Sequence, residues 1–338
     1  MKEVNNTILL VILLAITLVM SCSNNLNNPE ECREKDIPIL NCEAKDIPIL
    51  ACKEKDVPAL RSIALNAEIP LNKLMIYDSA EFFYNFHKDY GVAKVEIFLN
   101  NNTDIVALRV RDTRFNNLKL LSTLTELERI DLSNNKISKI EGLDNLHKLE
   151  NLDLSDNEIA ELNGIKNLNT LKALYIKENN ITKLDNLENL HSLENLYLAS
   201  NKISGLVNFR GLNKLKVLSL SNNKIDVIDL SGLKNLRVIR ARYNNISEIR
   251  NIKTLSKLAS LDIYGNPIYD IEGIENLKKL KFVYIGGNIG SYYRGDRHYF
   301  DNNNRDKADL FIEKFKKMKA EVITAPDVMV FLDKDDFK

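Results

Sequence analysis

A hydrophobic pattern with a fixed period runs along the chain from residue 105 onward. In the stretch "LERIDLSNNKISKIEGLDNL" the apolar positions are Leu127, Ile130, Leu132, Ile137, Ile140, Leu143 and Leu146. The second of these positions recurs every 22 residues, with a single step of 21, at Leu108, Ile130, Leu152, Leu174, Leu196, Leu218, Ile239, Leu261 and Val283. Such a period predicts a solenoid in which each unit packs on its neighbours.

Each unit predicts a short strand, an inward turn and a return segment. The "LxL" triplet directs two side chains into the core and is expected to pair in parallel with the next unit. The apolar residues of the return come at every third position, which favours a tight 3₁₀-like or irregular path over a long α-helix. The amides that follow the strands can satisfy buried backbone groups of adjacent loops, and they belong to Asn135, Asn157, Asn179, Asn201, Asn223, Asn244, Asn266 and Asn288.

These residues and their spacing resemble the leucine-rich repeat, in the 22-residue subclass of bacterial internalins and of a eukaryotic protein-phosphatase regulatory subunit. The resemblance implies a curved α/β solenoid over residues 105–290, with about nine short parallel strands lining its concave side. Thr113 stands where the first unit would have its asparagine, as expected of an edge repeat.

A solenoid exposes its core at both ends and therefore requires caps. Residues 63–104 are predicted to form the N-terminal cap. Within it, "YDSAEFFYNFHKDYG" predicts a helix that begins at Asp78 or Ser79 and ends at Gly91. The alternating stretch "AKVEIFLNN" that follows predicts a strand.

Residues 291–338 are predicted to form the C-terminal cap. The segment "RDKADLFIEKFKKMKAEV" spaces Phe311, Phe315 and Met318 as one face of a helix would. We expect this helix to cover the end of the core, with a partner-binding helix as the alternative.

The beginning of the chain carries a different hydrophobic pattern, an uncharged run from Ile8 to Met20. A bilayer-spanning helix needs about 20 apolar residues, so this shorter run is typical of a signal peptide. The tetrad that ends it, Val19-Met20-Ser21-Cys22, resembles the bacterial lipobox. The resemblance implies that residues 1–21 are removed and that Cys22 is acylated, for example with palmitate. A retained N-terminal anchor helix is the alternative.

The residues after this cysteine bear on the compartment. Ser23 and Asn24 stand where an aspartate often marks retention at the inner membrane of enteric bacteria. A lipid-anchored protein of the bacterial cell envelope is therefore predicted, at the outer membrane or cell surface rather than the inner membrane.

Residues 22–62 contain a ten-residue tandem repeat, "ECREKDIPIL", "NCEAKDIPIL" and "ACKEKDVPAL". The units hold few apolar residues, and each has a proline that favours extended backbone, so we expect a disordered tether. With Cys22 acylated, three thiols remain at Cys32, Cys42 and Cys52. This odd number predicts a disulfide-linked dimer or a free thiol. A metal site and an inert duplication are the alternatives.

Composition and motifs argue against several functions. Lys and Arg number 47 and Asp and Glu also 47, with no basic excess of the kind that nucleic acid requires. We find no phosphate-binding Gly-Lys-Ser/Thr loop, no GxSxG elbow and no His-Glu-xx-His helix. We therefore expect neither an enzyme nor a cofactor. The histidines lie far apart, at His87, His147, His191 and His298.

The residues that flank each "LxL" core pair are expected to point out of the concave face. Tyr175 and Tyr197 occupy equivalent positions of adjacent units, so their rings should lie about 5 Å apart. Aromatic and arginine side chains are enriched at protein interfaces, although aromatic residues also favour strands for their own sake. The predicted binding residues are Tyr175, Lys177, Tyr197, Arg240, Arg242, Tyr264, Phe282 and Tyr284, and Arg109 and Arg111 are also expected to face outward.

The tripeptide Arg294-Gly295-Asp296 resembles the integrin-recognition sequence, which works only on an exposed loop tip. Together these features predict an exported, lipid-anchored protein that binds another protein through its concave face. By resemblance to internalins, the ligand would be a host-surface or matrix protein. The alternative is a structural scaffold for envelope proteins in the periplasm.

Overall fold

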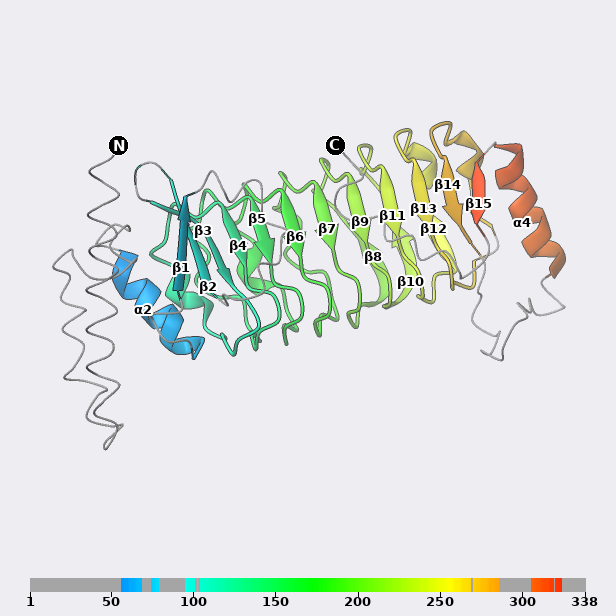
Figure 1. Ribbon diagram of the computed structural model, residues 1–338. Coiled ribbons are helices and arrows are strands. Elements are labelled where there is room, and N and C mark those ends of the chain that lie inside the picture. Colours follow the sequence, from blue (N-terminus) through cyan, green and yellow to red (C-terminus); the bar gives the residue numbers. More distant parts are fainter. Residues whose placement is uncertain are drawn as a thin grey trace, which may run out of the picture.

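The computed structural model describes residues 56–68, 74–78, 95–100, 102, 104–268, 270–285, 305–318 and 320–323. Figure 1 shows these residues as an elongated stack of turns between helix α2 (Val57–Asn66) and helix α4 (Arg305–Lys317). The predictions for the signal peptide, for the four cysteines, for Asn288 and for Arg294-Gly295-Asp296 concern residues outside this set. Within the described ranges, no helix combines the length and apolar character needed to cross a membrane.

One long sheet runs through the whole stack. Its neighbouring strands are parallel, except that the second and third are antiparallel. In spatial order the strands are β1 (Leu74–Asp78), β2 (Val95–Leu99), β3 (Ile105–Val110), β4 (Arg129–Asp131), β5 (Asn151–Asp153), β6 (Ala173–Tyr175), β7 (Asn195–Tyr197), β9 (Val217–Ser219), β11 (Val238–Arg240), β13 (Ser260–Asp262), β14 (Phe282–Tyr284) and β15 (Glu321–Ile323).

The strands from β3 to β14 confirm the predicted parallel solenoid. Each holds one of the nine recurring apolar residues, and successive recurring residues face one another, as Leu108 does Ile130 and Leu152 does Leu174. These side chains are fully buried, as is Leu132 of the "LxL" triplet. Removing one leucine side chain from water stabilises the fold by about 1.5–3 kcal/mol, so the regular leucines account for the stacking of the turns.

The predicted asparagine ladder is present among the described residues. The side-chain nitrogen of Asn157 donates to the carbonyl oxygens of Leu132 (3.0 Å), Leu154 (3.1 Å) and Ser155 (3.0 Å). Its side-chain oxygen accepts a bond of 3.0 Å from the backbone N–H of Ile137. Each such amide therefore joins two neighbouring turns and satisfies backbone groups that burial would otherwise leave without a partner.

The return segments on the convex side follow two different paths. Short 3₁₀ turns were predicted, and they occur as η6 (Leu118–Leu121), η7 (Asn163–Ile165), η8 (Ile252–Thr254) and η9 (Ile274–Asn276). The prediction missed a second, three-stranded parallel sheet of order β12-β10-β8, made of β8 (Ser204–Asn208), β10 (Lys224–Asp229) and β12 (Glu248–Arg250). β-Branched residues such as Val227 and Ile228 favour this extended path.

The N-terminal end corrects the predicted boundary of the tether. α2 begins at Val57, inside the region expected to be disordered up to residue 62. Pro58 suits the first turn of a helix, and Leu60 and Ile63 pack into the core and are buried. The predicted strand exists as β2, whereas most of the predicted helix at Asp78–Gly91 lies outside the described residues, after the end of β1.

The helix predicted near the C-terminal end is present as α4. Phe311 and Phe315 of α4 are buried, and their rings meet edge to face with centroids 4.9 Å apart. Met318 packs against the same core. The sequence did not predict β15, which extends the long sheet by pairing with β14.

Candidate protein-binding surface

The concave face, formed by the outward side chains of the long sheet, carries a stacked tyrosine pair at its centre. Tyr175 is the last residue of β6 and Tyr197 the last residue of β7, and the two are register partners. Their rings lie parallel, with centroids 4.6 Å apart and an interplanar angle of 7°. The predicted spacing is thereby confirmed, and the pair presents a rigid aromatic surface.

The tyrosine pair is half-buried and uncharged. Burial raises the pKa of Tyr175 far above its ordinary value, and the neighbouring Tyr197 and Asp153 act in the same direction. Burial likewise raises the pKa of Tyr197, partly offset by the charge of Arg240. Both phenols therefore stay neutral at physiological pH and can donate hydrogen bonds to a ligand.

A second group lies nearer the C-terminal end. Arg242 pairs with Asp262 on the neighbouring turn, and its guanidinium lies over the ring of Tyr284, 5.1 Å from the centroid. Burial raises the pKa of the Asp262 carboxyl, and the charge of Arg242 partly offsets this effect. The structure thus brings together two of the predicted residues, Arg242 and Tyr284, through an aspartate that the predicted set left out.

Two tyrosines of this region behave differently from expectation. Tyr264 was predicted to face outward and is buried, with only 8% of its surface exposed. Tyr243, which was not predicted, is 48% exposed and meets the Tyr264 ring edge to face, with centroids 5.7 Å apart. The backbone φ of Tyr243 is 51°, a left-handed conformation that is rare for a bulky residue. The position directly precedes a ladder asparagine, and Asn134 and Asn222 at the equivalent positions of other turns have φ of 54° and 57°.

The N-terminal end of the face departs most from prediction. Arg109 was expected to point outward with Arg111, but it is 1% exposed and forms an ion pair with Glu96 of β2. A second pair joins its Nε to Asp131 at 3.4 Å, and Arg111 approaches the same carboxylate at 3.7 Å. The side chain is covered because β2 precedes the repeats and pairs with β3, which the 22-residue period could not reveal.

The remaining predicted residues are spread along the face. Lys177 is exposed and lies 3.9 Å from Asp156 and 3.6 Å from Glu178. Phe282 is 39% exposed, and Arg240 is partly exposed beside Tyr197. Across the described ranges, no group of His, Cys, Asp and Glu side chains could hold a metal ion. What the face offers is aromatic and arginine surface for a polypeptide ligand.

Comparison with known proteins identifies a matching family and similar folds. Residues 115–229 match the family described as leucine-rich repeat. Among solved structures, an internalin (InlF) of Listeria monocytogenes is 23% identical over 65% of this chain and 67% of its own, with a TM-score of 0.51. An internalin C2 of the same species is 29% identical over 54% of this chain and 80% of its own, with a TM-score of 0.47.

A third solved structure, the functional domain of InlJ from Listeria monocytogenes, includes a cysteine ladder. It is 21% identical over 54% of this chain, with a TM-score of 0.43, and this chain spans 44% of that domain. No curated protein matches the sequence.

The family match covers the central repeats, and the likeness to InlF is a likeness of fold. A fold of this kind supports protein binding in general. The central repeats therefore match the leucine-rich-repeat family over residues 115–229, and the chain folds as a solenoid of parallel strands that resembles the fold of InlF.

Proposed function

We propose that the protein binds another protein through its concave face, with the Tyr175–Tyr197 stack as the main anchor. The observation that carries this proposal is the parallel stack itself, held at 4.6 Å on adjacent strands. Each tyrosine has only two side-chain torsions, and stacking already restricts them, so a ligand would bury the pair at little entropic cost. The Arg242, Asp262 and Tyr284 group supplies a second, polar contact.

The test is the double substitution Tyr175→Ala with Tyr197→Ala in the full-length chain. Truncating an interface anchor costs about 2 kcal/mol or more, so the affinity for a captured protein should fall roughly 30-fold. The melting temperature should change by only a few degrees, because these side chains point away from the core. Captured proteins would be identified by mass spectrometry and their affinities measured by surface plasmon resonance.

The matched control removes two exposed rings from the outer side of the solenoid, His147→Ala with His191→Ala. This pair should leave the affinity unchanged. A ligand that binds the tyrosine variant as tightly as the unaltered chain, but not the histidine variant, would place the interface on another side and end the proposal.

The proposal extends to an anchored protein of the bacterial envelope, lipidated at Cys22. It rests on the resemblance of Val19-Met20-Ser21-Cys22 to the lipobox. Cys22→Ala should give an uncleaved or soluble chain that no longer enters the detergent phase, and continued incorporation of radiolabelled palmitate would contradict it. Protease treatment of intact cells should remove a surface protein and spare a periplasmic scaffold. A host or matrix ligand, a role for Arg294-Gly295-Asp296 and a dimer through Cys32, Cys42 and Cys52 stay predictions.

A further inference from the structure

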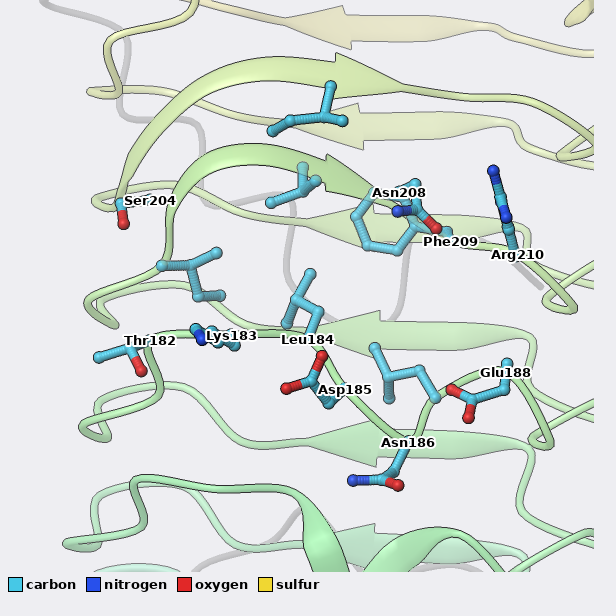
Figure 2. Close-up of a pocket in the computed structure, with 14 residues that line it drawn as sticks. Thr182, Lys183, Leu184, Asp185, Asn186, Glu188, Ser204, Asn208, Phe209 and Arg210 are labelled. Atoms are coloured by element: carbon cyan, nitrogen blue, oxygen red, sulfur yellow. The ribbon is translucent and has the colours of Figure 1, made fainter.

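The convex sheet has two outer edges, and a pocket lies beside each. The β8 edge faces the return segment Thr182–Glu188 of the preceding turn across a pocket of about 580 Å³ (Figure 2). The β12 edge faces Asp270–Glu272 of the following turn across a pocket of about 420 Å³. The two pockets arise where extended return segments adjoin irregular ones, so the sheet ends without a neighbouring strand.

Among the residues that the structure describes, β8 is hydrogen-bonded to another strand on one side only. β8 pairs with β10, in parallel. On its other side β8 faces the return segment of the preceding turn. Among the described residues, these two return segments share one backbone hydrogen bond, from the Lys202 N–H to the Ile181 carbonyl (2.9 Å), which lies before β8 begins. Because a strand within a parallel sheet directs main-chain groups to both sides, this edge of β8 presents N–H and C=O groups to the pocket.

The two edges differ in how they are protected. β12 carries Glu248 and Arg250, which pair at 2.8 Å, and Lys253 and Glu272 pair at 3.6 Å in the adjoining pocket. Charged side chains are the usual means by which proteins block strand addition. β8 carries no charge at all, and its Leu206 side chain is 53% exposed.

The pocket beside β8 has an apolar floor and open space above it. Leu184 lies on the wall opposite β8, and the buried Val207 and Phe209 also line the pocket (Figure 2). At Gly205, a Cβ would meet nothing within 4 Å. An extended chain can therefore reach the main chain of β8 without first displacing a side chain at this point.

We propose that an extended segment of a protein partner adds to β8 as a fourth strand of the convex sheet. The unpaired main-chain groups of this edge are complementary to a peptide backbone, and the apolar floor suits every second side chain of the segment. Acidic side chains (Asp185 and Glu188) and basic side chains (Lys183 and Arg210) both line the pocket, so charged side chains of either sign on the partner segment find a counterpart there.

The experiment selects random short peptides displayed on phage against the full-length chain in detergent. Selection uses the Tyr175→Ala, Tyr197→Ala variant, so that concave-face binding plays no part. Affinities of the selected peptides are then measured by fluorescence anisotropy. Leu206→Lys should weaken them at least about tenfold, because a lysine at the edge obstructs strand addition. Ser247→Lys adds the same charge beside β12 and should change them less than about twofold.

A second comparison tests the main-chain contact itself. Two series of peptides are N-methylated, one at the odd and one at the even residues, so that each series lacks the N–H donors along one edge. The affinity of one series should fall as much as Leu206→Lys lowers that of the parent peptide. Ser204→Lys, also at an exposed β8 residue, replaces Leu206→Lys if the latter lowers the melting temperature. The proposal is overturned if no peptide is selected, if both lysine variants bind alike, or if both methylated series bind as well as the parent.

Discussion

The two ends of the long sheet use the same chemistry, an arginine paired with a carboxylate on a neighbouring strand, in different surroundings. At the N-terminal end the side chains of Arg109 and Glu96 are 1% and 3% exposed. At the C-terminal end the side chain of Arg242 is 24% exposed and that of Asp262 is 9% exposed. The difference lies in what covers the arginine, since strand β2 lies beside Arg109, whereas the ring of Tyr284 lies against Arg242.

This comparison separates a charge that serves the fold from one that a ligand can reach. Removing charges from water is costly, and a buried pair is tolerated only when both partners are present. A partly exposed arginine over an aromatic ring retains hydration on its free side and can exchange it for a ligand. Three substitutions test this distinction, in order of decreasing effect.

The largest effect is expected from Arg109→Ala. The substitution leaves the Glu96 carboxylate buried without its partner, which should lower the free energy of unfolding by about 3–5 kcal/mol. Urea denaturation followed by circular dichroism measures this change. The double substitution Arg109→Met with Glu96→Leu should recover most of the loss. The Asp131 carboxylate, which also contacts Arg109, would still have Arg111 at 3.7 Å and a hydrogen bond of 2.7 Å from the Ser133 hydroxyl. A loss that the double substitution fails to reduce would show that packing, not charge, dominates at this end.

Arg242→Ala should cost less, about 1–2 kcal/mol, because water can hydrate one side of this pair. The Asp262 carboxylate is mostly buried, so some loss remains. The same denaturation experiment measures it. An effect as large as that of Arg109→Ala would remove the distinction between the two ends, and a ligand affinity unchanged by the substitution would exclude Arg242 from the binding surface.

The repeat region shows why so much of the fold followed from sequence. Leu108, Ile130 and the later residues at the same repeat position are buried against the equivalent residues of the adjoining turns. One period therefore fixes the strands, their register and the asparagine ladder. The Tyr175–Tyr197 stack followed for the same reason, since equivalent positions of adjacent units must be neighbours. Local pattern is sufficient wherever the structure is a repetition of one contact.

What the sequence did not predict depends on contacts between unlike segments. Arg109 is buried through Glu96, which belongs to a strand outside the repeats and pairs with the first of them in antiparallel fashion. The convex strands form in units where Val207, Val227 and Ile249 favour an extended backbone. Their pairing also requires that the return segments of adjacent units are all extended. Neither condition appears in the period of a single unit.

The smallest effect concerns two hydrogen-bonded carboxyl groups at one edge of the concave face, that of the partly buried Asp156 and that of the exposed Glu178. Both adopt left-handed backbone, with φ of 56° and 54°. Burial raises the pKa of Asp156 to about 6, and the hydrogen bond to Glu178 acts in the same direction. The partner carboxyl responds oppositely, since the hydrogen bond from Asp156 lowers the pKa of Glu178.

The sign of the resulting pH dependence follows from proton binding. A raised pKa means that the folded protein holds a proton that the unfolded chain releases near pH 4. The stabilisation from Asp156 is therefore complete below that pH and is lost as the pH rises through about 6. The lowered pKa of Glu178 acts only at more acidic pH, where its contribution is lost as the pH falls.

Asp156→Asn should remove this dependence without straining the backbone, because Asn134 and Asn222 hold equivalent positions with φ of 54° and 57°. Between pH 5 and pH 8, the melting temperature of the unaltered chain should fall by about one to two degrees relative to the variant. Differential scanning calorimetry at both pH values measures the difference, with Asp226→Asn at an exposed convex position as the charge-matched control. If the melting temperatures of both variants change with pH as that of the unaltered chain does, Asp156 is as well hydrated as a surface carboxylate. Burial then affects stability only at the fully enclosed Arg109 pair.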